Sequence, residues 1–280
     1  MTDIVRYAAF TDSGRGGNPA GVVLDAGGLT DEEMLRIAAD VGFSETAFVV
    51  GAAPAGWQVR YFSPRAEVAF CGHATIATAV ALADRDGPGE VTMVTPAGPV
   101  VVTSRATPDG TTATLMSVPP RTTPADPDVV SRALDALRWR ADELDPAYPV
   151  HVAFAGVHHL VVPAGSRERL AALDYDYPAL EALMAAEGWT TVHLFWRENE
   201  TTYHVRNPFP PGGVVEDPAT GAAAAAFGGY LRAVGLLTPP TTLTLLQGHD
   251  LGAPSRLVVD VADGTGGVAV TGRATPIAED

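Results

Sequence analysis

Two segments of the chain place polar, reactive side chains directly before a run of small apolar residues. The first, "EVAFCGHATIATAVALAD" (residues 67–84), contains Cys71 and His73. The second, "VEDPATGAAAAAFGGYL" (residues 215–231), contains Asp217. Each small-residue run predicts a helix, and the free amides and positive dipole end of a helix N-terminus favour an anion such as a carboxylate. The sequence therefore predicts two helix starts that could bind one anionic substrate.

Each helix start also has an ordinary structural explanation. A histidine in the position of His73 is often a cap or a packed polar group, and Asp217 before Pro218 is typical of a helix N-cap. An alanine-rich helix can also be buried for packing alone, and its occurrence in both halves does not by itself indicate a substrate site. A functional site is favoured because the polar groups occupy corresponding places in the two halves, and two such helices could point their N-termini toward one place.

The composition excludes several classes of partner. Of the 280 residues, 46% are hydrophobic and 18% charged, so the chain can bury a sizeable core. A formal net charge of −15 with scattered basic residues argues against a nucleic-acid surface, which needs clustered Lys and Arg. We expect no membrane contact and a cytoplasmic protein, because no stretch stays apolar for the roughly 18 residues of a span and the start lacks a signal-peptide pattern.

The residues that commonly bind metals are sparse. The single cysteine, Cys71, cannot form an internal disulfide or supply a structural zinc site, so it is a buried hydrophobe or a chemical group. His158 and His159 are adjacent, which sends them to opposite faces of a strand, and no third ligand stands at metal spacing. The sequence predicts structural or surface roles for both, and catalysis without a metal or an organic cofactor.

The elements around these segments are mostly short strands. In the first half, Thr30 and Glu33 form a capping box that begins a helix, which ends near Gly42. Alternating apolar segments on either side predict strands and hairpins. A proline-rich stretch, residues 117–128, then suggests a linker or crossover.

The second half repeats the order of the first. Helices are expected at residues 128–137, at residues 177–188 and from about Ala219 to Val234, with strand pairs between them. Both halves run strand pair, helix, hairpin, small-residue helix and strands, which favours an internal duplication. The predicted domains are residues 1–120 and residues 121–266, and the last strand (residues 267–280) could return to the first.

Four motifs together resemble the PhzF-type phenazine-biosynthesis family, which has the diaminopimelate epimerase fold. They are "GNPAGVV" (residues 17–23), "GFSETAFV" (42–49), "YFSPRAEVAFCGHAT" (61–75) and "EDPATGAAAAAFGGYL" (216–231). The motifs occur in the family's order and cover most of the chain. The resemblance implies an α+β fold of two similar domains, each a barrel-like, mostly antiparallel sheet wrapped around a central helix, with the active site in the cleft between them.

The resemblance also implies roles for individual residues. Glu45, in the family's SET motif, is the expected proton donor and acceptor, and a carboxyl group in a closed apolar cleft suits that role because its charged form is disfavoured. His73 and Asp217 match the family's GH and DPATG motifs. Substrate contacts are expected from Asn18, Gly72, His73, Asp217, Gly221 and Ala222, with a small carboxylate-bearing substrate and a homodimer.

Two departures limit what the resemblance implies. Related racemases use two cysteines on opposite faces of one carbon, whereas this chain has only Cys71. Family members often carry Ser after the last Gly of DPATG, where this sequence has Ala222, so a hydroxyl contact to substrate is missing.

Three hypotheses follow. The first is a cofactor-independent isomerase that moves a proton with Glu45, as in the family's isomerisation of trans-2,3-dihydro-3-hydroxyanthranilate. The second is an amino-acid or hydroxyproline-type racemase that uses Cys71 with another base. The third is a noncatalytic binding or scaffolding protein that kept the fold.

Overall fold

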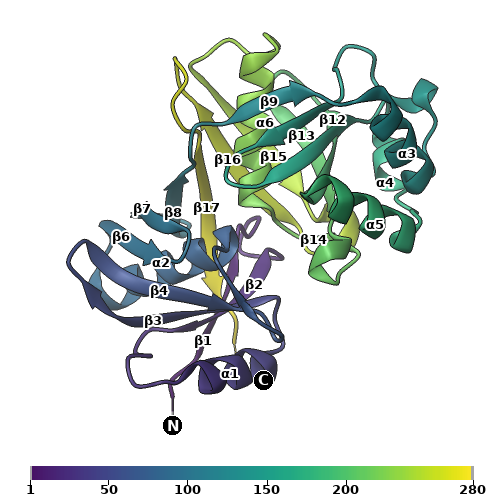
Figure 1. Cartoon of the computed structure of the whole chain (residues 1–280). Helices are drawn as coiled ribbons and strands as arrows, with labels where there is room; N and C mark the ends of the chain where they lie inside the picture. Colours follow the sequence, from purple (N-terminus) through teal and green to yellow (C-terminus); the bar gives the residue numbers. More distant parts are fainter. Residues whose placement is uncertain (1, 279–280) are drawn as a thin grey trace. The chain divides into compact units, whose positions relative to one another are not determined.

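The chain divides into two compact units in the computed structural model, which describes residues 2–278 (Figure 1). The first unit consists of Met1–Met116 with Thr271–Asp280, and the second of Ser117–Val270. The C-terminal segment therefore belongs to the first unit. The division falls slightly before residue 120 because the amide of Ser117 already bonds to the carbonyl of Val268, within the second unit.

The first unit is a closed barrel of eight strands. Its pairings run β1–β2–β3–β4–β6–β7–β8–β17 and return from β17 to β1. The pairs β2–β3 and β4–β6 are parallel. The strands are β1 (Val5–Ala9), β2 (Asn18–Val23), β3 (Glu45–Ala53), β4 (Gly56–Phe62), β6 (Glu90–Thr95), β7 (Gly98–Thr107), β8 (Gly110–Met116) and β17 (Ala269–Pro276), with the short β5 (Glu67–Val68).

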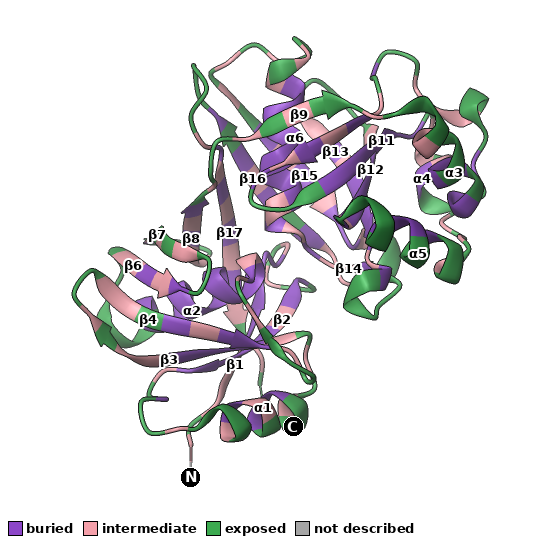
Figure 2. Ribbon diagram, viewed as in Figure 1, coloured by how far each residue is buried: buried purple, intermediate pink, exposed green. Residues whose placement is uncertain are grey.

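Helix α2 (Gly72–Asp86) is the central helix of this barrel, and α1 (Asp31–Val41) is its second helix. α2 contacts β1, β2, β3, β7 and β8, and its residues from His73 to Ala83 are all buried (Figure 2). Alanine and threonine side chains let strands approach from several sides. On α1, the capping box of Thr30 and Glu33 is confirmed.

The second unit is built on a similar sheet. Its pairings run β9–β10–β11–β12–β13–β15–β16, with β11–β12 and β13–β15 parallel. The strands are β9 (Arg121–Pro124), β10 (His151–Phe154), β11 (His158–Pro163), β12 (Trp189–Arg197), β13 (Thr202–Pro208), β14 (Glu216–Asp217), β15 (Thr241–Gln247) and β16 (Ser255–Val261). The helices are α3 (Pro127–Leu137), α4 (Arg167–Ala171), α5 (Tyr177–Glu187) and α6 (Gly221–Ala233), with 3-10 turns at Ala141–Glu143, Pro210–Gly212 and His249–Leu251.

Helix α6 is the counterpart of α2. It contacts β9, β10, β11, β12 and β16, and it is buried along most of its length (Figure 2). Glycine is required where a neighbour comes closest, because a Cβ atom on Gly229 would lie 2.2 Å from Cβ of Pro120. The expected fold class is confirmed: each unit is a mostly antiparallel sheet wrapped around a central helix.

The strand pairings support the duplication. The series β1–β2, β2–β3, β3–β4, β4–β6 and β6–β7 has the same sequence of antiparallel and parallel pairs as β10–β11, β11–β12, β12–β13, β13–β15 and β15–β16. Even the short strands correspond, since β5 pairs with β4 and β14 pairs with β13.

Two expectations about the second unit were wrong in detail. The stretch expected to be a linker, residues 117–128, contains strand β9, which pairs with β10 from Arg121 to Pro124. Prolines are tolerated in strands at the edge of a sheet, and among the described residues β9 pairs with β10. Helix α6 begins at Gly221 instead of Ala219, with Thr220 as its N-cap.

No helix within residues 2–278 is both long and apolar enough to cross a membrane.

Candidate active site

The first cluster of functional side chains lies where two parallel strands begin. Asn18 is the first residue of β2 and Glu45 the first of β3, and the strand register pairs Ala20 with Glu45. Gly17 leads into β2 with a φ of 83°, and a Cβ atom there would lie 2.6 Å from the carbonyl oxygen of Ala9. A side chain at that position would displace the turn that presents Asn18.

The N-terminus of α2 completes this cluster. Cys71 is the N-cap residue in extended conformation, no side chain caps the helix, and Gly72 and His73 form its first turn. Because Gly72 has no side chain, the backbone at this helix start is open to close approach. The helix dipole favours negative charge at this end.

His73 contacts three polar neighbours. Its Nδ1 lies 3.2 Å from Nδ2 of Asn18, and its Nε2 lies 3.4 Å from Oγ of Ser44 and 3.4 Å from Oε2 of Glu45. Because the Asn18 amide nitrogen can only donate, Nδ1 is the acceptor in this contact, which makes Nε2 the donor nitrogen of the ring. Nε2 therefore presents a proton to the Glu45 carboxylate.

The two oxygens of Glu45 have different surroundings. Oε2 lies 3.5 Å from Sγ of Cys71 and 3.4 Å from Nε2 of His73. Among residues 2–278, no side chain forms a hydrogen bond or ion pair with Oε1. Glu45 is partly exposed, with 17% of its side chain accessible, whereas Cys71 and His73 are buried. One oxygen is thus anchored and the other is available to take up and return a proton.

A buried hydroxyl chain fixes the helix start below this cluster. The Tyr61 hydroxyl lies 2.7 Å from Oγ1 of Thr75, which donates to the carbonyl of Cys71 at 2.7 Å. Burial raises the pKa of Tyr61 well above its ordinary value, so its hydroxyl stays protonated as a donor. The position of Cys71 therefore depends on strand β4 as well as on α2.

The second cluster lies at the N-terminus of α6. Asp217 accepts a hydrogen bond from the Thr220 hydroxyl at 2.6 Å through Oδ2. Gln247, at the end of β15, donates to the carbonyl of Asp217 at 2.7 Å and to Oγ1 of Thr220 at 2.9 Å, and it accepts from the amide of Thr220 at 3.0 Å. The side chain of Gln247 therefore holds the whole turn between Asp217 and the helix.

The helix start itself carries small residues. Gly221 is buried and begins α6, Ala222 follows it, and no side chain caps this helix. Ala222 offers a methyl group where a serine would offer a hydroxyl. The ordinary reading of Asp217 as a helix N-cap is wrong, because Thr220 occupies that position.

A buried ion pair supports the strand that carries Asp217. Arg206 donates to both carboxylate oxygens of Glu216, through Nε at 2.9 Å and through Nη2, and its Nη1 donates to the carbonyl of Ala171. Both side chains are more than nine-tenths buried. In the strand register, Asn207 pairs with Asp217, so this ion pair is next to the second cluster.

The second unit also contains a buried polar network. His159 donates to Thr191 at 2.7 Å, Thr191 donates to Asn207 at 3.0 Å, and His193 donates to Asn207 at 3.2 Å. Burial lowers the pKa of His159 to about 3 and that of His193 to about 4. His158 is exposed while His159 is fully buried, so the expected alternation and the structural role of His159 agree with the structure.

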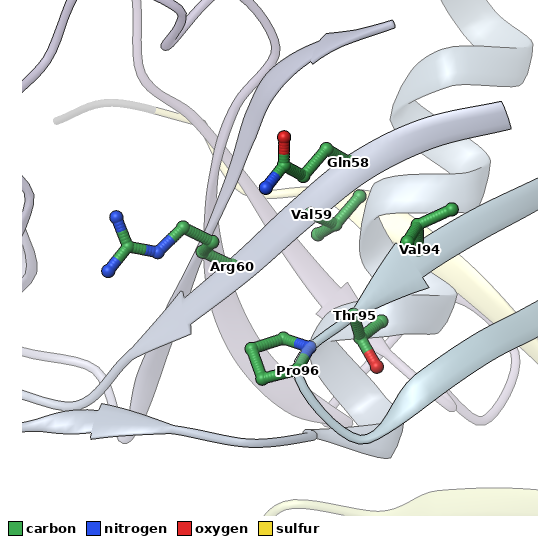
Figure 3. Close-up of a pocket in the computed structure, with 6 residues that line it drawn as sticks. All are labelled: Gln58, Val59, Arg60, Val94, Thr95 and Pro96. Atoms are coloured by element: carbon green, nitrogen blue, oxygen red, sulfur yellow. The ribbon is translucent and has the colours of Figure 1, made fainter. Parts of the chain in front are cut away.

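A surface depression on the first unit involves other residues. It is lined by β4 and β6 and the turn after β6 (Figure 3), and its lining residues are Gln58, Val59, Arg60, Val94, Thr95 and Pro96. Its one cationic group, Arg60, already binds Glu67 through Nε and Nη2 and Asp31 through Nη1. The depression therefore offers no spare charge for an anionic ligand.

The predicted site residues thus form two groups, each within one unit. Asn18, Glu45, Cys71, Gly72 and His73 come together in the first, and Asp217, Gly221 and Ala222 in the second. Sequence reasoning assigned no role to Gln247 or Arg206, which carry no signal because their partners are distant in sequence. Thr220 and Glu216 lie within the EDPATG motif, but their contacts to Asp217 and Arg206 were not predicted. Ser44 was within the quoted SET motif.

Known proteins resemble this chain over almost its full length. The sequence model of the family described as "Phenazine biosynthesis-like protein" matches residues 7–280. The chain is 30% identical over 285 residues to the Bacillus subtilis protein named uncharacterized isomerase YfhB, which covers 98% of this chain and 96% of that protein. It is 30% identical to a Pseudomonas chlororaphis protein named trans-2,3-dihydro-3-hydroxyanthranilate isomerase, with 91% of this chain and 88% of that protein covered.

A solved structure supports the same relationship. The crystal structure of the Bacillus anthracis phenazine biosynthesis protein of the PhzF family matches with a TM-score of 0.88 at 27% identity, and the match covers 99% of this chain and 98% of that one. The resemblance inferred from the four motifs is therefore confirmed. The protein belongs to the PhzF-type phenazine-biosynthesis family and is an isomerase.

Proposed function

We propose that this isomerase moves a proton on a small carboxylate-bearing substrate without a cofactor, and that Glu45 carries the proton. The observation that supports this most directly is the asymmetry of the Glu45 carboxylate, whose Oε2 is held by Cys71 and His73 while Oε1 has no side-chain partner among the described residues. A positioned carboxylate of this kind is suited to general acid and base catalysis.

The proposed reaction has two steps. Oε1 of Glu45 takes a proton from one carbon of the substrate, and the electron pair of the broken C–H bond delocalises over the adjacent unsaturated system. The same carboxyl group then returns the proton to a second carbon, and a new C–H bond forms there. His73, as a donor to Oε2, orients the carboxylate in both steps.

We further propose that the second cluster binds the substrate. The uncapped start of α6 offers backbone amides to a carboxylate, and Asp217 offers an acceptor to an amine or hydroxyl. Asn18 and Gly72 are proposed to contribute contacts from the first cluster. The homodimer and the cytoplasmic location stay predictions.

The candidate substrate is trans-2,3-dihydro-3-hydroxyanthranilate, because a relative that is 30% identical is named for its isomerisation. Proton NMR of this compound with the protein in D2O tests the proposal. We expect conversion with deuterium incorporated at carbon, and a loss of roughly 10²–10⁴-fold in kcat for Glu45→Gln. The exposed Glu32→Gln on α1 is the matched control and is expected to behave as wild type.

Two other outcomes separate the parts of the proposal. Absence of conversion by the wild-type protein would reject this substrate. Other small amino or hydroxy acids would then be tested, with deuterium uptake as the measure of turnover. Conversion that survives in Glu45→Gln would reject Glu45 as the proton carrier. For the binding role, Asp217→Asn is expected to raise KM more than Asp263→Asn, an exposed control in the same unit.

The geometry argues against the racemase that pairs Cys71 with Glu45. A two-base racemase needs its bases on opposite faces of one carbon, but Sγ of Cys71 and Oε2 of Glu45 are only 3.5 Å apart. No carbon with its substituents fits between two atoms in direct contact.

A further inference from the structure

We infer that Glu45, Cys71 and His73 form a binding site for a thiophilic divalent cation of the Zn²⁺ class. Each residue offers one ligand atom, and the three atoms lie within 4.8 Å of one another. Thiolate, imidazole and carboxylate are the three ligand types that zinc takes in proteins. Binding of the cation alone does not depend on the proposed function.

The distances between these atoms suit a tetrahedral ion. Zinc–ligand bonds of about 2.0–2.3 Å at tetrahedral angles separate the ligand atoms by roughly 3.3–3.6 Å. Here Nε2 of His73 lies 3.4 Å from Oε2 of Glu45, Sγ of Cys71 lies 3.5 Å from the same oxygen, and Sγ lies 3.8 Å from Nε2. The ligand triangle therefore has nearly the required size before any ion is bound.

One side chain has to turn. Sγ of Cys71 also lies 3.3 Å from Nδ1 of His73, so the sulfur is beside the ring and not on the axis of one nitrogen. A rotation of the imidazole about its Cβ–Cγ bond brings Nε2 toward the shared position. The contacts that oppose this rotation are at or beyond the long end of the hydrogen-bond range, at 3.2 Å to Asn18 and 3.4 Å to Ser44.

The surroundings select the ion. A thiolate ligand favours Zn²⁺ or Cd²⁺ over Mg²⁺ and Ca²⁺, which prefer oxygen ligands only. The partly exposed Glu45 lets the ion reach two buried ligands. Coordination releases the thiol proton of Cys71 to solvent. The proton on Nε2 of His73 moves to Nδ1, which the rotated ring no longer presents to Asn18, so that Nε2 can bind the ion. The fourth position is left to water or to a substrate carboxylate.

The site has a consequence for activity, which rests on the proposed function. An ion bound to Oε2 of Glu45 withdraws electron density from the carboxylate and removes the Nε2 donor of His73, so the same side chains cannot transfer a proton. Zn²⁺ is then expected to inhibit the enzyme reversibly, because the ion-bound form cannot transfer the proton.

A Cd²⁺ titration of the full chain without an affinity tag tests the binding. Cd²⁺ bound to a thiolate has a charge-transfer band in the ultraviolet, and Cys71 is the only cysteine, so the band reports one position. We expect one Cd²⁺ per chain, displacement by Zn²⁺ and no displacement by excess Mg²⁺. No band, or a band that Mg²⁺ removes equally well, would overturn the inference.

Variants separate a three-ligand site from a lone thiol. Glu45→Gln and His73→Asn are each expected to raise the Cd²⁺ dissociation constant at least tenfold, since even outer-shell changes cost 10–100-fold. Glu32→Gln and the exposed His158→Asn are expected to bind as wild type. If both ligand variants keep wild-type Cd²⁺ affinity and their thermal transitions, the band arises from Cys71 alone, and the three-ligand site is rejected.

Inhibition is measured separately from binding. Zn²⁺ is expected to abolish deuterium incorporation into the converted substrate, and a chelator is expected to restore it. If the protein binds Cd²⁺ as described but turns over no candidate substrate, the metal site stands and the proposed function fails. If turnover is unaffected at Zn²⁺ concentrations that fully displace Cd²⁺ from the site, the prediction that Zn²⁺ inhibits the enzyme is wrong.

Discussion

At the scale of single residues, the first cluster combines two buried side chains with one that is partly exposed. Cys71 and His73 are buried, and both direct polar atoms toward Oε2 of Glu45. In the proposed mechanism, this arrangement gives Glu45 the defined orientation that proton transfer requires, and Cys71 is proposed to orient Glu45 instead of acting as a second base.

Cys71→Ser tests that assignment. We expect kcat to fall by less than about tenfold, because serine keeps a short polar group at the N-cap and Glu45 still carries the proton. Steady-state kinetics by NMR gives the comparison. Complete loss of turnover, with the thermal transition unchanged, would instead favour chemistry at the thiol.

At the scale of elements, each functional turn is held by a side chain from another strand. Tyr61 on β4 reaches the start of α2 through Thr75, and Gln247 on β15 reaches the start of α6. The helix starts are thus positioned by tertiary contacts, since neither is capped by a side chain of its own.

Gln247 offers a graded test of this support. Gln247→Leu removes the hydrogen bonds that this side chain makes to the amide of Thr220 and to the carbonyl of Asp217, and we expect a loss of about 2 kcal/mol or more in the free energy of unfolding. Gln247→Glu keeps an acceptor for Thr220 and is expected to lose less. Denaturant unfolding measures both, with Gln58→Leu, a change at an exposed residue of β4, as the control.

The buried histidines predict how stability depends on pH. Burial lowers the pKa of His159 to about 3 and of His193 to about 4, whereas both titrate near 6.5 when unfolded. The unfolded chain therefore binds more protons, so their stabilising effect is complete above pH 6.5 and is lost as pH falls toward 4. We expect each to contribute a slope of about 1.4 kcal/mol per pH unit in that window.

Unfolding measured at several pH values checks this slope. His159→Asn and His193→Asn are each expected to flatten it, because the substituted residue no longer takes up a proton on unfolding. The exposed His158→Asn should leave the slope as in wild type. An identical slope in all three variants would contradict the prediction.

At the scale of the whole molecule, the first unit depends on both ends of the chain. β17 lies between β1 and β8 and closes the barrel, although it comes after almost all of the second unit in sequence. The second unit, by contrast, is one continuous segment, Ser117–Val270.

A truncated chain tests this dependence. If the chain stops at Val270, β1 and β8 become open edges, and we expect the first unit to lose its cooperative transition while the second keeps its hydrogen-exchange protection. A chain that stops at Pro276 retains β17 and is the control. Equal protection of β1 in both chains would show that the barrel does not need its closing strand.

Much of this structure follows from local sequence. The capping box of Thr30 and Glu33, the two small-residue helices and the alternating strands arise from interactions among residues close in sequence, so pattern alone predicts them. The motifs that contain Glu45, Cys71, His73 and Asp217 likewise indicate the family from sequence alone. These features need no knowledge of which strands pair.

Other features were decided by tertiary structure alone. β9 within a proline-rich stretch exists because β10 supplies its hydrogen bonds, and Gln247 holds the Asp217 turn from 30 residues away. The anchoring of one Glu45 oxygen by Cys71 and His73 depends on how a strand start and a helix start meet. No local pattern encodes such contacts, because their energy comes from partners that only the folded chain brings together.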